Sequence, residues 1–345
     1  MAGQLGGLQG KVKETYQSAL FVHCMAHRLN LVMQQSLNKI RQCKILFQTL
    51  SGLAAFFSKS SKRSTALDQE VHKRLPRVAP TRWSYNGRLV ETVFEYRLPL
   101  IDFFQKIMDN RQDWDNETVV CSTGYLNMLQ REGDFNFLLL VFSQIFPFCD
   151  NLFSVLQTKM SDINFCIRKI QEFRRIVSSK RDQFDEFWQK FEYLDILTTE
   201  PERKRTRTED TVNDKKMDPK TQARKLFYEI IDNILAQIDD RFNNFKSLKF
   251  LELVNFEENN ALSEEAFNSL QQNYPNFFDF PALCSELFVL YNTSEGLNKH
   301  SVSELLKSIK ECGLHRACPE IVKLCELSLT IPATSTSAER SFSTL

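Results

Sequence analysis

Residues that interrupt helices are scarce in this sequence, with 10 glycines and 10 prolines among 345 residues. A sandwich or barrel of short strands needs many turns, so this scarcity argues against a turn-rich β fold and favours long helices. An excess of charge of one sign is also lacking, because the formal net charge is only +1. The chain therefore has no overall basic field, and any contact with nucleic acid must come from a local patch.

The sequence pattern also shows no secretory leader and no long uninterrupted apolar run. The residues after Met1 show no basic stretch followed by an apolar one, and the most apolar stretch, 135–148, is interrupted by polar side chains. That stretch is too short and too polar to span a bilayer. The nine cysteines follow no framework spacing, so we expect reduced thiols. The sequence predicts a soluble intracellular protein with no membrane partner.

Hydrophobic residues are abundant, at 42% of the chain with 29 phenylalanines, which is enough for a sizeable core. Apolar residues at steps of three and four predict helices within 29–50, 89–107, 136–158, 163–176, 226–245, 263–272, 281–292, 301–311 and 319–328. Residues 17–23 are a short apolar run that predicts one buried strand before the first helix. Residues 60–64 predict a polar loop, and the charged segment at about 198–222 predicts a disordered linker.

The first chemical motif is the pair Cys24-x-x-His27, at the predicted junction of strand and helix. This spacing could be half of a zinc site, whose second half would be Cys312, His315 and Cys318 far along the chain. The alternative is that Cys24 and His27 pack or form hydrogen bonds at the junction.

Two further motifs each have a structural and a functional interpretation. Arg82-Trp83 is either an ordinary core tryptophan beside an arginine, or a pair in which Arg82 contacts a phosphate and Trp83 stacks on an unstacked base. The closing segment 331–343 places a Ser/Thr cluster before Glu339. That cluster predicts a capped helix start, with Glu339 favoured by the helix dipole; alternatively, Glu339 is a metal ligand.

In this order and combination, the three motifs resemble the C-terminal catalytic-core region of hAT-type (Activator-like) DNA transposases. The nearest likeness is to the zinc-finger-MYM-like, domesticated hAT relatives. The resemblance implies a mainly α fold with a partial α/β RNase H-like core and a large all-helical insertion. It implies the partial core, with strand, Cys-x-x-His element and helix, at 1–85, the helical insertion at 86–317, and the start of the hAT C-terminal dimerisation region at 318–345.

The resemblance also implies a role for each motif residue. Glu339 matches the family's catalytic glutamate, which holds divalent metal (Mg or Mn) together with two aspartates. Arg82 and Trp83 match the DNA-binding pair. Cys24 and His27 match a structural element adjacent to the active site.

The two aspartates have no counterpart in this chain. In the family both precede the Cys-x-x-His element, but the one carboxylate before Cys24 here is Glu14, and the first aspartate is Asp68. Later aspartates such as Asp102 and Asp150 fall in predicted insertion helices. We therefore expect no intact metal site and no cofactor in this chain, and we expect the missing residues to have been lost ahead of Met1 by truncation or by an internal start.

The sequence thus predicts a transposon-derived, hAT-like protein fragment that is catalytically inactive by itself. It would retain dimerisation with itself or a related protein through its C-terminal region, together with residual DNA binding in the nucleus. The basic segment 203–207 would be either a nuclear import signal or a solvated loop. Two alternatives remain: part of an active metal-dependent transposase whose two aspartates lie upstream of Met1, and a helical scaffold without a nucleic-acid role.

Overall fold

Every regular element in the described part of the chain is helical. The computed structural model describes residues 7–76, 84–130, 133–158, 162–196, 218–242, 246–256, 261–292 and 297–334. These residues form fifteen α-helices and four 3-10 segments, with no strand among them. The prediction of a mainly α chain is therefore confirmed.

The chain folds into two compact units that alternate along the sequence. Unit 1 consists of Met1–Leu29, Leu152–Glu172 and Ile238–Leu345, and unit 2 of Asn30–Asn151 and Phe173–Gln237. The stretches of unit 2 therefore interrupt those of unit 1. Four helices contribute residues to both units: α2 (Met25–Asn38), α8 (Asp134–Leu156), α9 (Ile163–Lys180) and α11 (Pro219–Phe242).

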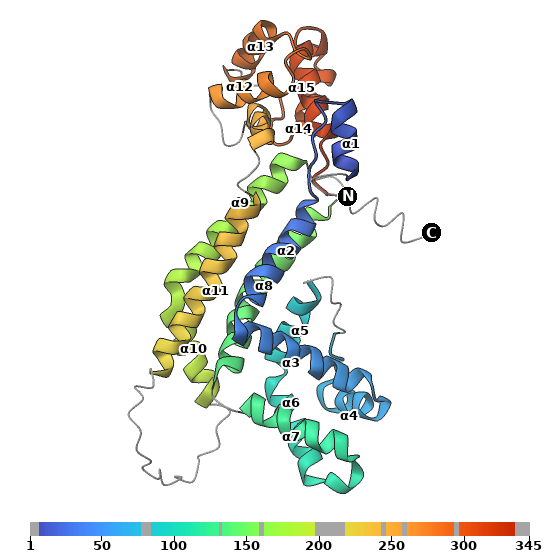
Figure 1. Cartoon of the computed structure of the whole chain (residues 1–345), viewed down its shortest axis with the longest axis vertical. Coiled ribbons are helices and arrows are strands. Elements are labelled where there is room, and N and C mark those ends of the chain that lie inside the picture. The colour runs from blue at the N-terminus through green and yellow to red at the C-terminus, as the bar shows by residue number, and fades with distance from the viewer. Residues whose placement is uncertain are drawn as a thin grey trace. The chain divides into compact units, whose positions relative to one another are not determined.

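Unit 2 has an aromatic core between short helices. Its remaining elements are α3 (Arg41–Ser58), α4 (Ser61–Val71), α5 (Ser84–Glu95), α6 (Arg97–Asp109), η1 (Arg111–Asp113), α7 (Asn116–Gln130), η2 (Arg181–Gln183) and α10 (Phe184–Ile196). Helix α3 packs against α4, and α6 packs against α7 (Figure 1). The ring of Phe57 lies 5.5 Å from that of Phe103, and Phe104 lies 5.6 Å from Tyr125. Such ring pairs stabilise a core beyond the area that they bury.

A second aromatic contact joins α10 to α11 within unit 2, and we name it the α10–α11 seam. Phe227 of α11 is completely buried. Its ring centroid is 5.7 Å from that of Phe184 and 5.0 Å from that of Phe187, both on α10. Residues 226–238 repeat apolar side chains at helical spacing, and that pattern places Phe227 on the buried face.

In unit 1, two carboxylates accept hydrogen bonds from backbone amides near helix starts. Its other elements are α1 (Leu8–Thr15), η3 (Lys246–Val254), α12 (Glu264–Asn273), α13 (Phe280–Asn292), α14 (Val302–Glu311), η4 (Leu314–Arg316) and α15 (Pro319–Thr330). Glu286 Oε2 on α13 accepts a hydrogen bond from Ile321 N in the first turn of α15, at 2.9 Å. Glu320 Oε2 accepts one from Asp279 N, at 3.1 Å. Both bonds satisfy amides near helix starts that have no partner inside their helix.

The strand predicted at 17–23 is wrong. Residues 18–24 have neither helical nor strand structure, and Phe21 leaves 42% of its surface exposed. A strand is completed only by hydrogen bonds to a neighbouring backbone, and the described residues supply no second strand. For the same reason the structure does not support the partial α/β RNase H-like core.

The polar loop predicted at 60–64 is also wrong, because these serines begin a helix. Ser60 is the N-cap of α4, and its Oγ accepts a hydrogen bond from Arg63 N at 3.4 Å. Serine competes with backbone groups in a helix interior but stabilises a helix start. The predicted linker at 198–222 overlaps α11, which begins at Pro219; residues 198–217 lie outside the described residues.

Helix α8 is, among the described residues, the one helix whose length and composition would suffice to cross a membrane. Of the 18-residue apolar stretch of α8 that meets this criterion, 56% is buried within the protein. Its residues 137–142 are all buried, and Pro147 lies inside the helix. A helix that is apolar all round and covered by other helices is the pattern of a core helix.

Candidate functional site

The Cys24-x-x-His27 element lies at the start of α2, where it meets the far end of the described chain. Met25 N donates a hydrogen bond to Ala333 O at 3.0 Å. Cys24 Sγ lies 3.6 Å from Thr334 Oγ1, across a sequence separation of 310 residues. The structure therefore places the first sequence motif beside Ala333 and Thr334, in the described part of the closing segment 331–343.

Cys24 and His27 differ in their surroundings. Cys24 is half-buried, and its backbone oxygen accepts the hydrogen bond from Arg28 N that opens α2. His27, in the first turn of the helix, is exposed. Burial, with the nearby Asp162 and Cys24 as further causes, raises the pKa of the Cys166 thiol on α9 to about 12. Cys24 thus adjoins a buried thiol rather than a solvent-filled site.

The zinc alternative receives no support from this geometry. Within the described residues, no group of three or more His, Cys, Asp or Glu side chains is arranged to hold a metal ion. Cys312 and His315 are exposed on and beside η4. Cys24 contacts Thr334 at the start of α2, whereas His27 is exposed there.

A group of basic side chains surrounds this helix start, and we name it the basic cluster: His23, His27, Arg28 and Arg241. Arg28 Nη1 donates a hydrogen bond to Arg241 O, in the last turn of α11, at 2.6 Å. An arginine that donates to a terminal helix carbonyl is stabilised by the negative end of the helix dipole. Part of the role of Arg28 is therefore structural.

The electrostatics of the basic cluster are repulsive. Burial lowers the pKa of Arg28, and the charge of Arg241 lowers it further. Burial likewise lowers the pKa of His23, with Arg28, His27 and Arg241 as further causes in that order. Like charges held within a few ångströms disfavour each other's charged forms. A bound anion would relieve that repulsion.

The other predicted site residues lie outside the described residues. These are Arg82, Trp83 and Glu339. Asp102 and Asp150 lie in α6 and α8, as expected. Burial raises the pKa of Asp150 to about 6, with Glu91 as a further cause and Arg88 as an opposing one.

Sequence reasoning missed His23 and Arg241 as site residues. Arg241 sits in the last turn of a helix that the periodicity predicts, and His23 directly precedes the Cys-x-x-His element. A basic residue in a last turn is ordinarily read as a partner of the helix dipole. Nothing in the spacing indicates that the end of α11 meets the start of α2.

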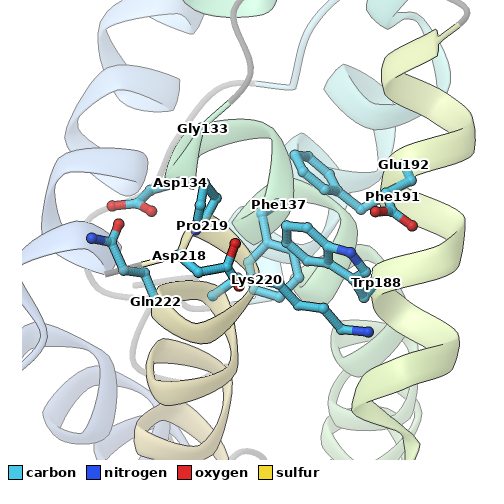
Figure 2. A pocket seen from close by; sticks show the side chains of 11 residues that line it. Gly133, Asp134, Phe137, Trp188, Phe191, Glu192, Asp218, Pro219, Lys220 and Gln222 are labelled. Carbon is cyan, nitrogen blue, oxygen red and sulfur yellow. The ribbon is translucent and has the colours of Figure 1, made fainter. Parts of the chain in front are cut away.

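A pocket of about 890 Å³ lies in unit 2, between residues of α8, α10 and α11 (Figure 2). Cys24 and His27, the motif residues that the structure describes, are not among its lining residues. No family model matches the chain, and a search of the solved structures finds no match to it.

Proposed function

We propose that this chain is a hAT-like, transposon-derived nuclear protein that binds the DNA backbone and associates with itself or a related chain. The observation that carries this proposal is the basic cluster, which surrounds the Cys24-x-x-His27 motif, whose Cys24 contacts Thr334. In the sequence, Thr334 stands shortly before Glu339. The proposal does not require an RNase H-like core.

Phosphate contact follows from the chemistry of the basic cluster. Arginine binds phosphate through charge and paired N–H donors, and a helix start offers backbone amides to the same anion. With a net charge of only +1, the chain depends on such a local patch for attraction to DNA. Arg82 and Trp83 complete the proposal as a phosphate contact and a base-stacking surface.

Strand cleavage is not part of the proposed activity of this chain. In-line phosphoryl chemistry needs several carboxylates to hold divalent metal. The family holds Mg or Mn with one glutamate and two aspartates. This chain has the glutamate, Glu339, but its first 67 residues contain no aspartate.

The test of DNA binding is a titration of a short random-sequence duplex at several salt concentrations. We expect Arg28→Gln and Arg241→Gln to weaken binding, and each to reduce the slope of log affinity against log salt by about one. Arg28→Lys keeps the charge and should keep the slope. Arg316→Gln, an exposed arginine of unit 1 outside the cluster, is the matched control.

Two outcomes would count against backbone binding. Equal loss of affinity in Arg316→Gln and Arg28→Gln would show that only overall charge matters. The absence of binding by the wild type would favour a helical scaffold. Arg82→Ala and Trp83→Ala test the second contact, and Trp83→Ala should weaken single-stranded binding more than duplex binding, since stacking needs an unstacked base.

For self-association, the structural support is an exposed apolar face on α13 of unit 1, formed by Cys284, Phe288 and Val289. Phe288 is 66% exposed and Val289 is 59% exposed. The one charged residue of α13, Glu286, bonds to Ile321 N instead of facing outward. In a two-fold contact the same face of both copies meets itself, so an uncharged face pairs without repulsion.

The α13 face predicts a weak dimer. Phe288 and Val289 expose on the order of 200 Å², against the ~800 Å² that each partner buries in a stable complex. We expect a concentration-dependent dimer in sedimentation, reduced by Phe288→Ser but not by Val120→Ser, an exposed valine of unit 2. Oxidation should join two copies through Cys284. A clean wild-type monomer at micromolar concentration would remove this half of the proposal.

A further inference from the structure

The pocket of unit 2 combines an aromatic wall with a charged rim (Figure 2). Its volume of about 890 Å³ falls in the range typical of ligand sites, roughly 300–1,000 Å³. Phe137 of α8 packs 5.6 Å from Phe191 of α10, which packs 5.4 Å from Trp188. These three rings line the pocket together with Pro219 and Ala223 of α11.

The charged residues on the rim are mostly acidic. Asp134, Glu192 and Asp218 line the pocket with a single cation, Lys220. Lys220 Nζ lies 2.9 Å from Asp185 Oδ1, a carboxylate outside the lining. Asp218 also caps α11, since it accepts a hydrogen bond from Thr221 N at 3.2 Å. Asp134 and Glu192 are exposed, so the rim presents carboxylates to a cationic ligand.

The neighbouring α10–α11 seam holds two arginines between rings and carboxylates. The guanidinium of Arg224 lies 4.8 Å from the ring centre of Phe184, and its Nη2 lies 3.0 Å from Asp185 Oδ1. Arg181, in η2, lies 4.6 Å from the ring centre of Tyr228, with its Nε 2.8 Å from an Asp232 carboxylate oxygen. Twice, therefore, an arginine of this unit packs on a ring and pairs with a carboxylate.

We propose that the pocket binds an arginine side chain from a basic peptide of a partner protein. The guanidinium packs against the rings of Trp188 and Phe191, and Glu192 accepts its hydrogen bonds, with Asp134 adding to the attraction. Arginine is favoured over lysine because its planar fork stacks on aromatic rings and pairs with a carboxylate through two donors. This inference is independent of the proposed DNA binding, which uses residues of unit 1.

The experiment measures the anisotropy of a labelled arginine-glycine peptide titrated with the full chain, beside a lysine-glycine peptide of equal charge. We expect saturable binding of the arginine peptide, with the lysine peptide several-fold weaker. Glu192→Gln should weaken arginine-peptide binding on the order of tenfold. Glu186→Gln, an exposed carboxylate on the same helix outside the lining, should leave it unchanged.

The chain's own basic segment, 203–207, stands between Glu192 and Asp218 in the sequence and could compete with the peptide. A variant with Arg203, Arg205 and Arg207 changed to serine removes that competitor. Binding by this variant, at the wild-type affinity or more tightly, supports the proposal. Equal affinity for the arginine and lysine peptides, equal losses in Glu192→Gln and Glu186→Gln, or no binding by either wild type or the serine variant overturns it.

Discussion

One pair of arginines in each unit has opposite surroundings: Arg181 and Arg224 in unit 2, and Arg28 and Arg241 in unit 1. In unit 2, Arg181 and Arg224 each lie on an aromatic ring and pair with an aspartate. In unit 1, Arg28 donates to a backbone carbonyl, and the neighbouring charge that shifts its pKa is that of Arg241. Opposite charges at these distances stabilise the fold modestly, whereas like charges oppose it. Arg181 and Arg224 thus serve packing in unit 2, whereas we propose that Arg28 and Arg241 of unit 1 also attract an external anion.

The largest expected effect tests whether unit 2 depends on its rings. Phe227→Ala removes a fully buried ring from the α10–α11 seam. Deletion of a buried phenylalanine leaves a cavity, so we expect a loss of about 3–5 kcal/mol in unfolding free energy, measured by urea denaturation. Tyr193→Ala, whose side chain is 65% exposed, should cost less than about 0.5 kcal/mol. Similar losses in both variants would mean that the seam is not a packed core.

In unit 1 the corresponding test removes a capping carboxylate. Glu286→Ala leaves Ile321 N, in the first turn of α15, without its side-chain acceptor. A lost acceptor at a helix start costs about 1–2 kcal/mol. Glu286→Gln keeps an acceptor oxygen at the same place and should lose less than half as much. If both substitutions cost the same in urea denaturation, the charge of Glu286, rather than its hydrogen bond, is what stabilises α15.

A smaller effect on stability is expected from Asp150, a closely packed carboxylate of unit 2. A Cβ added to Gly87 would lie 2.3 Å from Asp150 Oδ2, so α5 and α8 approach closely there. Burial raises the pKa of Asp150 to about 6, above the value of about 3.9 for an unfolded aspartate. The folded state therefore disfavours the charged form, and the destabilisation is complete above the folded pKa and disappears as the pH falls toward the unfolded pKa.

Asp150→Asn removes this destabilisation. With allowance for solvent screening, we expect the variant to be more stable than the wild type by about 1 kcal/mol at pH near 8. That advantage should shrink as the pH falls from about 7 to about 4, and the difference between the two urea midpoints measures it. A variant that is less stable at pH 8 would show that attraction to Arg88 outweighs the cost of burial.

Periodicity predicted the long helices well, because their buried faces are broad and regular. The pattern at 163–176 corresponds to α9, and the pattern at 281–292 corresponds to α13. The pattern at 29–50 is continuous in the sequence but divides into α2 and α3, because the chain turns at Lys39 and Ile40. Apolar spacing predicts which face of a helix is buried. It does not predict where one helix ends and the next begins when both pack on the same core.

The site could be predicted only in part. Cys24 and His27 were expected at a junction of strand and helix; the helix is there, as α2, but the strand is not. The contact of Cys24 with Thr334 and of Arg28 with Arg241 joins segments far apart in the sequence, and a local pattern carries no information on such pairs. The prediction of a strand at 17–23 was wrong for a related reason. A strand needs a partner strand, and the apolar run at 17–23 does not specify one.

The smallest expected effect tests the repulsion in unit 1 directly. The pKa of His23 is lowered by burial and then by Arg28, His27 and Arg241. Because its folded pKa lies below the unfolded value of about 6.5, the folded state favours neutral His23. Stability is therefore lost as the pH falls through about 6.5. Arg241→Gln should raise the pKa of His23 in an NMR titration and reduce that loss, whereas Arg316→Gln should change neither.

The pKa of His23 also tests the proposed binding of DNA by unit 1. Phosphates bound at the basic cluster would favour protonated His23, so duplex DNA should raise its pKa in the wild type. The rise should be smaller in Arg28→Gln, which lacks one of the phosphate contacts. A His23 pKa that responds to Arg241→Gln but not to DNA would support the repulsion within the basic cluster and would contradict phosphate binding there. A pKa that responds to neither would mean that the like charges of unit 1 are screened from one another, and the contrast with Arg181 and Arg224 of unit 2 would disappear.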